Sequence, residues 1–228
     1  MHTFTLSGRT SVLQAHYNPA IRLDGNYEIG LINFETYNAI PNVDANNNAL
    51  QVDDFLIEIP VGSYEISDIN RVINAKLPKN AHFHLFANNN TLKSIIKCDK
   101  NVDFNVKNSI GSLLGFEGSK VLKAINSPHI SDHVVDILRV NTIQIECNIV
   151  HGSYSNNDSS HVVHHFFPNV APGFKIIETP QNVIYMPLNT NTIDNITLKI
   201  VDQDGNLVNF RQEVVTIRLH LRRQSNGS

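Results

Sequence analysis

The sequence contains no tryptophan, only two cysteines and few charged residues among its 228 residues. Charged residues make up 17% of the chain and hydrophobic residues 41%, which is typical of a folded protein with a sparsely charged surface. Cys98 and Cys147 have neither the number nor the spacing of a disulfide framework or a zinc site. We expect both to be buried free thiols, since a chain of this length can bury a core without such cross-links.

Long apolar runs are also missing. No stretch approaches the roughly 20 residues of a membrane span, and residues 1–6 lack the apolar core of a signal peptide. The sequence therefore predicts synthesis and folding in the cytosol, with no membrane span. The net charge of −3 gives no general reason to bind nucleic acid, so no specific nucleic-acid binding is expected.

The strongest signal that is present is alternation of apolar and polar residues. Residues 196–201 and 214–221 alternate β-branched or leucine side chains with polar ones, and Ile217 and Leu219 are expected to point inward. Because Asp204-Gly205 suits a tight reversal, we expect these two stretches to form a hairpin at the end of the chain.

Residues 27–37 also alternate and predict a long strand. A strict period of two would place one set of side chains on one face and the intervening set on the other. The first set comprises Tyr27, Ile29, Leu31, Asn33, Glu35 and Tyr37, and the second Glu28, Gly30, Ile32, Phe34 and Thr36.

Helical periodicity is confined to two short segments, residues 66–74 and residues 109–114. The connections between the expected strands are short and irregular, unlike the crossovers of a parallel sheet. The sequence therefore predicts an all-β protein: a single jelly-roll β-sandwich over residues 1–228, with two short helices in its connections.

Several phrases, taken in order, resemble a known family. They are LSGRTSVL at 6–13, the run 27–43, IPVGSYEI at 59–66, SIGSLLGF at 109–116, and the block 166–188 that contains PGFKIIE. In this order they resemble the minor capsid, or penton, proteins of Polinton (Maverick) elements and adintoviruses. The resemblance spans nearly the whole chain, from Leu6 to Arg222, and none of its phrases is a catalytic signature.

The resemblance implies a structural protein rather than an enzyme. It implies a single jelly roll that forms the five-fold vertices of an icosahedral shell, with no catalytic residues, cofactor or metal. The implied partners are further copies of the chain, in a homopentamer, and the double jelly-roll major capsid protein. The implied location is the virion, after synthesis in the host cytosol and assembly in the nucleus.

The sharpest cluster of chemically active side chains is His161, His164 and His165, with His151 ten residues before the first. Three converging imidazoles would favour Zn²⁺ or Cu²⁺. On a regular strand, however, His161 and His165 face one way and His164 the other. Histidines on a strand at the surface are the simpler interpretation, and a pH-sensing role for them is left open.

The turn at 202–206 resembles the opening of a calcium-binding loop. Glu213 is the twelfth residue counted from Asp202, as a bidentate calcium ligand would be. Leu207 occupies the position that requires glycine, and no helices are expected on either side, so a simple turn is predicted. Arg218, Arg222 and Arg223 form a small basic end, which is either a solvated tail or a contact for packaged DNA or an acidic neighbour.

Two alternatives to a capsid role remain. The same architecture is used by carbohydrate- and receptor-binding modules, although the chain lacks the tryptophan of a typical sugar platform. A cupin-like enzyme would need a His-x-His pair with a further ligand motif. His82 and His84 form such a pair without a matching partner motif, so enzymatic activity is not expected.

Overall fold

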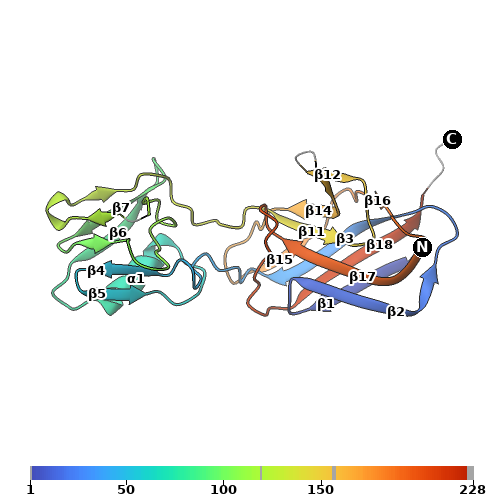
Figure 1. The fold of residues 1–228 in the computed structure, drawn as a ribbon, viewed down its shortest axis with the longest axis horizontal. Helices are drawn as coiled ribbons and strands as arrows, with labels where there is room; N and C mark the ends of the chain where they lie inside the picture. The colour runs from blue at the N-terminus through green and yellow to red at the C-terminus, as the bar shows by residue number, and fades with distance from the viewer. Residues whose placement is uncertain (1, 119, 156–157, 225–228) are drawn as a thin grey trace. The chain divides into compact units, whose positions relative to one another are not determined.

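The computed structural model describes residues 2–118, 120–155 and 158–224, and the chain divides into two compact units (Figure 1). The first unit comprises Met1–Ile40 with Val140–Ser228, and the second comprises Pro41–Arg139. The second unit is therefore an insertion in one connection of the first. The sequence predicted a single domain over residues 1–228 and gave no sign of two units. That these units behave as one domain stays a prediction.

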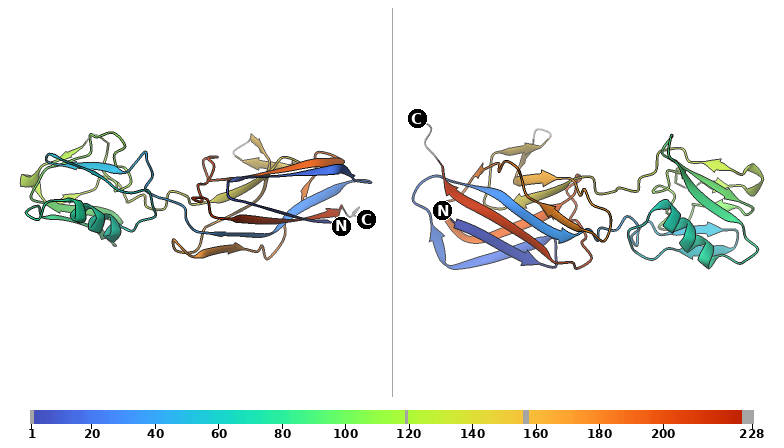
Figure 2. Two further views of the ribbon diagram at one scale, coloured as in Figure 1. Left: turned by 90° about the horizontal axis from the view of Figure 1, so that it is seen from below. Right: turned by 180° about the vertical axis from the view of Figure 1, so that it is seen from behind.

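The first unit contains two sheets that face each other as separate layers (Figure 2, left view). The first sheet has the order β1 (His2–Gly8), β18 (Val215–Arg223), β3 (Tyr27–Tyr37) and β15 (Lys175–Glu178), and the short β16 (Met186–Pro187) also pairs with β3. The second sheet has the order β14 (Val162–Phe166), β11 (Ile143–Cys147), β17 (Thr192–Val201) and β2 (Val12–Arg22). A separate hairpin pairs β12 (Ser153–Ser155) with β13 (Asp158–Ser160).

The order of these strands is that of a jelly roll. If β16 and the hairpin are left out, eight strands remain. Numbered from one to eight along the chain, they lie in the spatial order 1, 8, 3, 6 in the first sheet and 5, 4, 7, 2 in the second. The pairings between these strands are antiparallel. Chain neighbours thus lie in opposite sheets except β11 and β14, which pair with each other, and this is the order of the double Greek key of a jelly roll. The all-β jelly-roll prediction is confirmed.

The predicted terminal hairpin is wrong, because β17 and β18 belong to opposite sheets. The reversal at Asp204-Gly205 does form, but it folds the chain back onto β17: the Val208 N–H donates to the Ile200 carbonyl at 3.1 Å. The remaining residues up to 214 then carry the chain across to the other layer. A turn signal close to a strand end specifies a reversal and leaves the pairing partner open.

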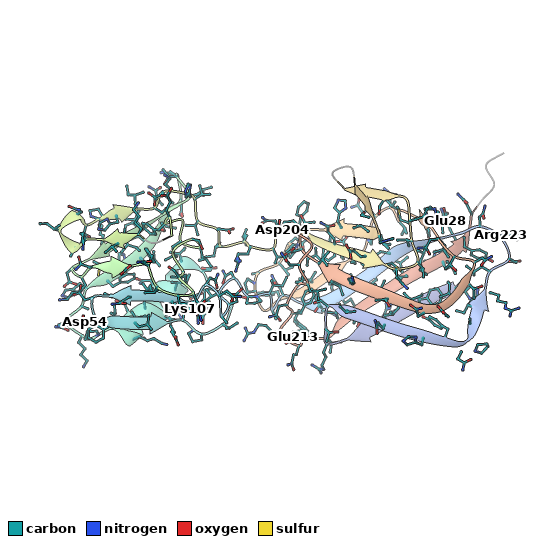
Figure 3. All side chains as sticks on the ribbon, viewed as in Figure 1. Glu28, Asp54, Lys107, Asp204, Glu213 and Arg223 are labelled. Atoms are coloured by element: carbon teal, nitrogen blue, oxygen red, sulfur yellow. The ribbon has the colours of Figure 1, made fainter. Side chains whose placement is uncertain are left out.

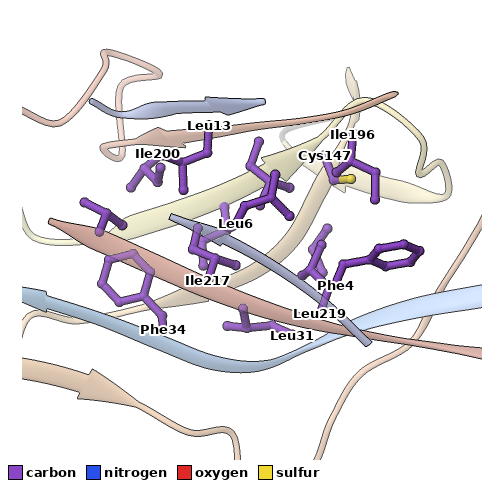
Figure 4. Close-up of a cluster of buried hydrophobic side chains, with 14 of the residues drawn as sticks. Phe4, Leu6, Leu13, Leu31, Phe34, Cys147, Ile196, Ile200, Ile217 and Leu219 are labelled. Atoms are coloured by element: carbon purple, nitrogen blue, oxygen red, sulfur yellow. The ribbon is translucent and has the colours of Figure 1, made fainter. Parts of the chain in front are cut away.

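The faces of these two strands were predicted correctly. Ile217 and Leu219 are completely buried, as are Ile196, Leu198 and Ile200 on β17. The inward side chains of both sheets meet in one apolar cluster (Figure 4). Because both strands place their apolar face inward, they contribute opposite walls of a single core.

Strand β3 departs from the strict alternation expected for it. Ile29 and Leu31 point inward as predicted, but Phe34 and Thr36 are the buried residues further along. The pairing with β18 shows the cause, since Leu219 lies opposite Leu31 and Arg218 lies opposite Asn33, which leaves Ile32 as an extra residue. Such a bulge exchanges the two faces of the strand beyond it.

The second unit has its own core. One sheet has the order β5 (Phe55–Glu58), β4 (Ala49–Val52), β8 (Val102–Asp103) and β9 (Val121–Leu122), and the other the order β10 (His129–Ile130), β7 (Lys93–Cys98) and β6 (Phe83–Asn88). The helix α1 (Ile66–Lys76) contacts β6, and a 3₁₀ turn, η1, spans Ala124–Asn126. Both sheets and α1 contribute to a second buried apolar cluster.

Of the two predicted helices, the first is present and the second is a turn. In α1, Ile66, Ile69 and Ile73 form the buried stripe, and Asp68 accepts a hydrogen bond from the Glu65 N–H at 3.2 Å. Residues 109–114 form only a hydrogen-bonded turn, in which the Leu114 N–H donates to the Ile110 carbonyl. Glycines at 111 and 115 disfavour further helix, and the Ala49 carbonyl binds the Ile110 N–H instead.

Within the described ranges, no helix is long and apolar enough to cross a membrane.

Candidate functional site

The histidines singled out in the sequence do not converge. His164 Nε2 lies 2.9 Å from Glu178 Oε1, whereas His161 Nδ1 lies 2.8 Å from the Val150 carbonyl oxygen, and His165 is exposed. A bulge in the pairing of β14 with β11 disturbs the alternation expected for these residues. Among the residues that the structure describes, no group of three or more potential metal ligands is found.

The contact between His164 and Glu178 joins the two sheets, and the sequence did not predict it. His164 lies on β14, at the border of the second sheet, and Glu178 ends β15, at the border of the first. Their side chains are only 15% and 26% exposed. Nothing in the local sequence singles out Glu178, since no short stretch indicates that two strands of different sheets meet there.

The turn at 202–206 is built by its own side chain rather than by a cation. Asp202 Oδ1 accepts hydrogen bonds from the N–H groups of Asp204 and Asn206, at 2.9 and 2.8 Å. Asp204 and Glu213 are labelled in Figure 3 and lie well apart, so Glu213 does not complete a ligand set with the turn. The carboxylate of Asp202 caps the reversal, and the segment is the simple turn that was predicted.

Two of the three arginines at the basic end lie close to carboxylates of the first unit. Arg222 Nε lies 2.6 Å from Glu28 Oε1, and its guanidinium carbon lies 3.5 Å from the centre of the Tyr185 ring. Arg223 lies 4.0 Å from Asp24, near the label of Glu28 in Figure 3. Arg222 is thus paired within its own unit, whereas the Arg223–Asp24 pair is long and its two side chains are mostly exposed.

The remaining sequence candidates are structural. His82 and His84 border an open depression of about 490 Å³ in the second unit, together with Lys97 and Asp99. The Asp99 carboxylate is already engaged by the His82 N–H at 3.0 Å. No metal-ligand group of three or more is found there among the described residues.

Both cysteines are free and buried, as expected. Burial raises the pKa of the Cys147 thiol to about 11. Burial likewise raises the pKa of Cys98 above its ordinary value. A thiol that stays protonated is a poor nucleophile, so both side chains act as packing groups.

A depression of about 600 Å³ at one end of the sandwich is a candidate site for the carbohydrate-binding alternative. Its lining is mainly amide side chains and backbone, with Tyr27 as the aromatic residue. The Tyr27 hydroxyl donates to Asp24 at 2.8 Å. A single tyrosine at the rim, with its hydroxyl already bonded, gives little surface for stacking a sugar ring.

Exposed apolar side chains gather on the first unit near β15. Tyr37 on β3 lies opposite Lys175, and Ile177 lies opposite Glu35, so all four project from the outer face of the first sheet. Lys175 Nζ binds Glu35 Oε2 at 2.6 Å across this group. The same neighbourhood includes the loop 167–174. The exposed fractions are 49% for Tyr37, 57% for Ile177, 66% for Phe174 and 68% for Phe167.

The pairing registers place this loop at one end of the sandwich. Gly8, Tyr37, Lys175 and Val215 lie at the same end of the first sheet. Four connections therefore leave at that end: residues 9–11, the inserted segment with its flanks at 38–142, residues 167–174 and residues 202–214. We call Tyr37, Phe167, Phe174 and Ile177 the apolar patch. Sequence analysis did not single out this patch, because Tyr37 lies more than a hundred residues before the other three members.

The fold is similar to that of the mavirus penton protein. The crystal structure of that protein, labelled with selenomethionine, aligns with a TM-score of 0.52 over 96% of this chain and 97% of that chain, at 14% sequence identity. No protein-family model matches the chain, and no curated protein sequence matches it. At this identity the likeness establishes a shared fold, which includes the inserted unit because nearly the full length of both chains is covered.

Proposed function

We propose that this protein is the penton of an icosahedral, virus-like shell. The observation that carries the proposal is the jelly-roll strand order with a whole compact unit inserted between its third and fourth strands, over the same length as a viral penton chain. The ordered phrases from 6–13 to 166–188 support a shell of the Polinton or adintovirus type. In this role the chain binds further copies of itself in a ring of five and contacts the major capsid protein.

The surface of the first unit is suited to such a ring. A cyclic ring is heterologous, so one surface of each copy meets a different surface of the next. The apolar patch offers exposed aromatic side chains, which are enriched at the centres of protein interfaces, and the adjacent Lys175–Glu35 pair has no net charge. The whole chain carries a net charge of only −3, which limits the electrostatic repulsion between copies.

The test is co-expression with the cognate double jelly-roll major capsid protein, followed by electron cryo-microscopy of the particles. We expect shells whose five-fold positions are filled by five copies of this chain. The isolated protein need not form the ring, since association costs several kcal/mol of motional entropy that the surrounding shell offsets. Shells whose five-fold positions are empty, or are filled by another protein, would refute the proposal.

A further inference from the structure

The borders of the two sheets in the first unit differ in how well they are protected against pairing with another chain. A free edge exposes unpaired N–H and C=O groups, and proteins usually blunt such edges with proline, charge, bulges or short strands. At the border of the second sheet, β2 contains Pro19 and has a register shift opposite Ile193 and Asn195. At the other border, β14 has a bulge, and β15 is only four residues long and carries Lys175 and Glu178.

Strand β1 has none of these protections. It pairs with β18 in unbroken register from His2 to Gly8, and in the described structure no strand lies on its other side (Figure 2). Its seven residues include no proline, lysine, arginine, aspartate or glutamate. The backbone groups that point away from β18 therefore form a regular and uncharged edge.

The side chains of β1 are also self-complementary. Hydroxyl residues at Thr3, Thr5 and Ser7 are exposed on the outer face, and Phe4 and Leu6 point into the core. On each side of Thr5, the first residue is apolar and the second carries a hydroxyl group. An antiparallel copy centred on Thr5 would thus place Thr5 opposite Thr5, Phe4 opposite Leu6, and Thr3 opposite Ser7. Each of these is a favourable cross-strand pair.

We propose that β1 is a docking edge for β1 of a second copy of this chain, paired antiparallel about a two-fold axis through Thr5. The two first sheets then become one continuous sheet. The other edge strands of the sandwich are less suitable partners for the free edge of β1, because each carries a proline, a charge or a bulge. The contact is isologous and so differs from the heterologous contact of a five-membered ring, and it does not depend on the penton function.

The test replaces Thr5 with glutamate in the full-length chain. Arg218 lies directly opposite Thr5 within the same molecule, so the T5E variant keeps a favourable cross-strand pair in its own fold. In the two-fold contact, however, the substitution places two carboxylates opposite each other. Q14E on β2 is the matched control, since Gln14 is an exposed polar residue on an edge strand that is already blunted.

Sedimentation equilibrium over a wide concentration range should show a reversible monomer–dimer equilibrium. We expect T5E to raise the dimer dissociation constant roughly tenfold or more, and Q14E to leave it unchanged. Mixing T5E with T5K should restore association. Hydrogen exchange should show that the β1 amides not bonded to β18 become protected only as the dimer forms.

Three results would overturn the proposal. One is a chain that stays monomeric at every accessible concentration. Another is a dimer that T5E and Q14E affect equally. The third is protection at another strand edge while the free amides of β1 continue to exchange. Circular dichroism of each variant establishes that a lost dimer reflects the contact rather than the fold.

Discussion

At the scale of single residues, Gly30 shows how one position can hold a distant segment in place. A β-carbon at this position would lie 2.5 Å from Val183 Cγ1 and 2.8 Å from the Ile184 carbonyl oxygen. The segment before β16 therefore lies directly against the outer face of β3. Tyr185 extends this contact by bonding His220 Nδ1 at 2.7 Å and by stacking with Arg222. Glycine is needed here for close approach rather than for its backbone freedom.

Replacing Gly30 with alanine should lower the free energy of unfolding by about 1–3 kcal/mol, because the new methyl group overlaps backbone that cannot easily move. Chemical denaturation followed by circular dichroism measures the change. The matched control is G118A, since a β-carbon at Gly118 meets no atom within 4 Å. An equal effect at both positions would show that the contact with 183–184 is unimportant.

At the scale of elements, the two layers are connected at one border by β1 and β2 and at the opposite border by β14 and β15. The short connection at 9–11 joins the first pair covalently in sequence. The connection between β14 and β15, residues 167–174, is longer. The hydrogen bond from His164 to Glu178 supplies a contact along this border.

A double-mutant cycle with H164Q and E178Q should give a coupling free energy of about 1 kcal/mol, because the pair is mostly shielded from water and its hydrogen bond involves a carboxylate. Urea unfolding of the four proteins measures it. The same cycle at Lys175 and Glu35 should give a smaller value, since Lys175 is 43% exposed and the pair is screened. A coupling near zero at His164 and Glu178 would mean that the border does not need the contact.

At the scale of the whole molecule, the exposed apolar patch is the feature with the clearest consequence for assembly. Scattered exposed hydrophobic residues are normal on any protein, as Ile125 shows with an exposed fraction of 92% in the second unit. The patch differs because Tyr37 and Ile177 lie on the paired strands β3 and β15, and Phe174 immediately precedes β15. Such grouping is typical of a surface that another molecule covers.

We predict that F174D will abolish incorporation of this chain into shells while leaving the isolated protein folded. Phe174 is 66% exposed, so a carboxylate there is well hydrated in the free protein but would be desolvated and unpaired at an interface. Particle composition after co-expression with the major capsid protein measures the effect. I125D, at a position that is even more exposed and lies outside the patch, is the control. Normal incorporation of F174D would exclude the patch from the contact between copies.

The sequence by itself determined the local properties of this protein. Strand periodicity placed Ile217, Leu219, Ile196 and Leu198 in the core, helical periodicity over residues 66–74 specified α1, and Asp204-Gly205 specified a reversal. These signals act over a few residues, because a side chain's face follows directly from the backbone period. The all-β class and the jelly-roll type followed from the number of such strands and from the resemblance carried by the ordered phrases.

The tertiary structure alone decided which strands pair and which side chains meet across them. It separated β17 from β18, added the bulge that exchanges the faces of β3, and turned residues 109–114 into a turn bonded to Ala49. It also brought His164 to Glu178 and gathered the apolar patch from segments far apart in the chain. Each of these outcomes depends on contacts between distant residues. The energies that select one pairing over another are a few kcal/mol spread over a whole sheet, and no short stretch of sequence contains them.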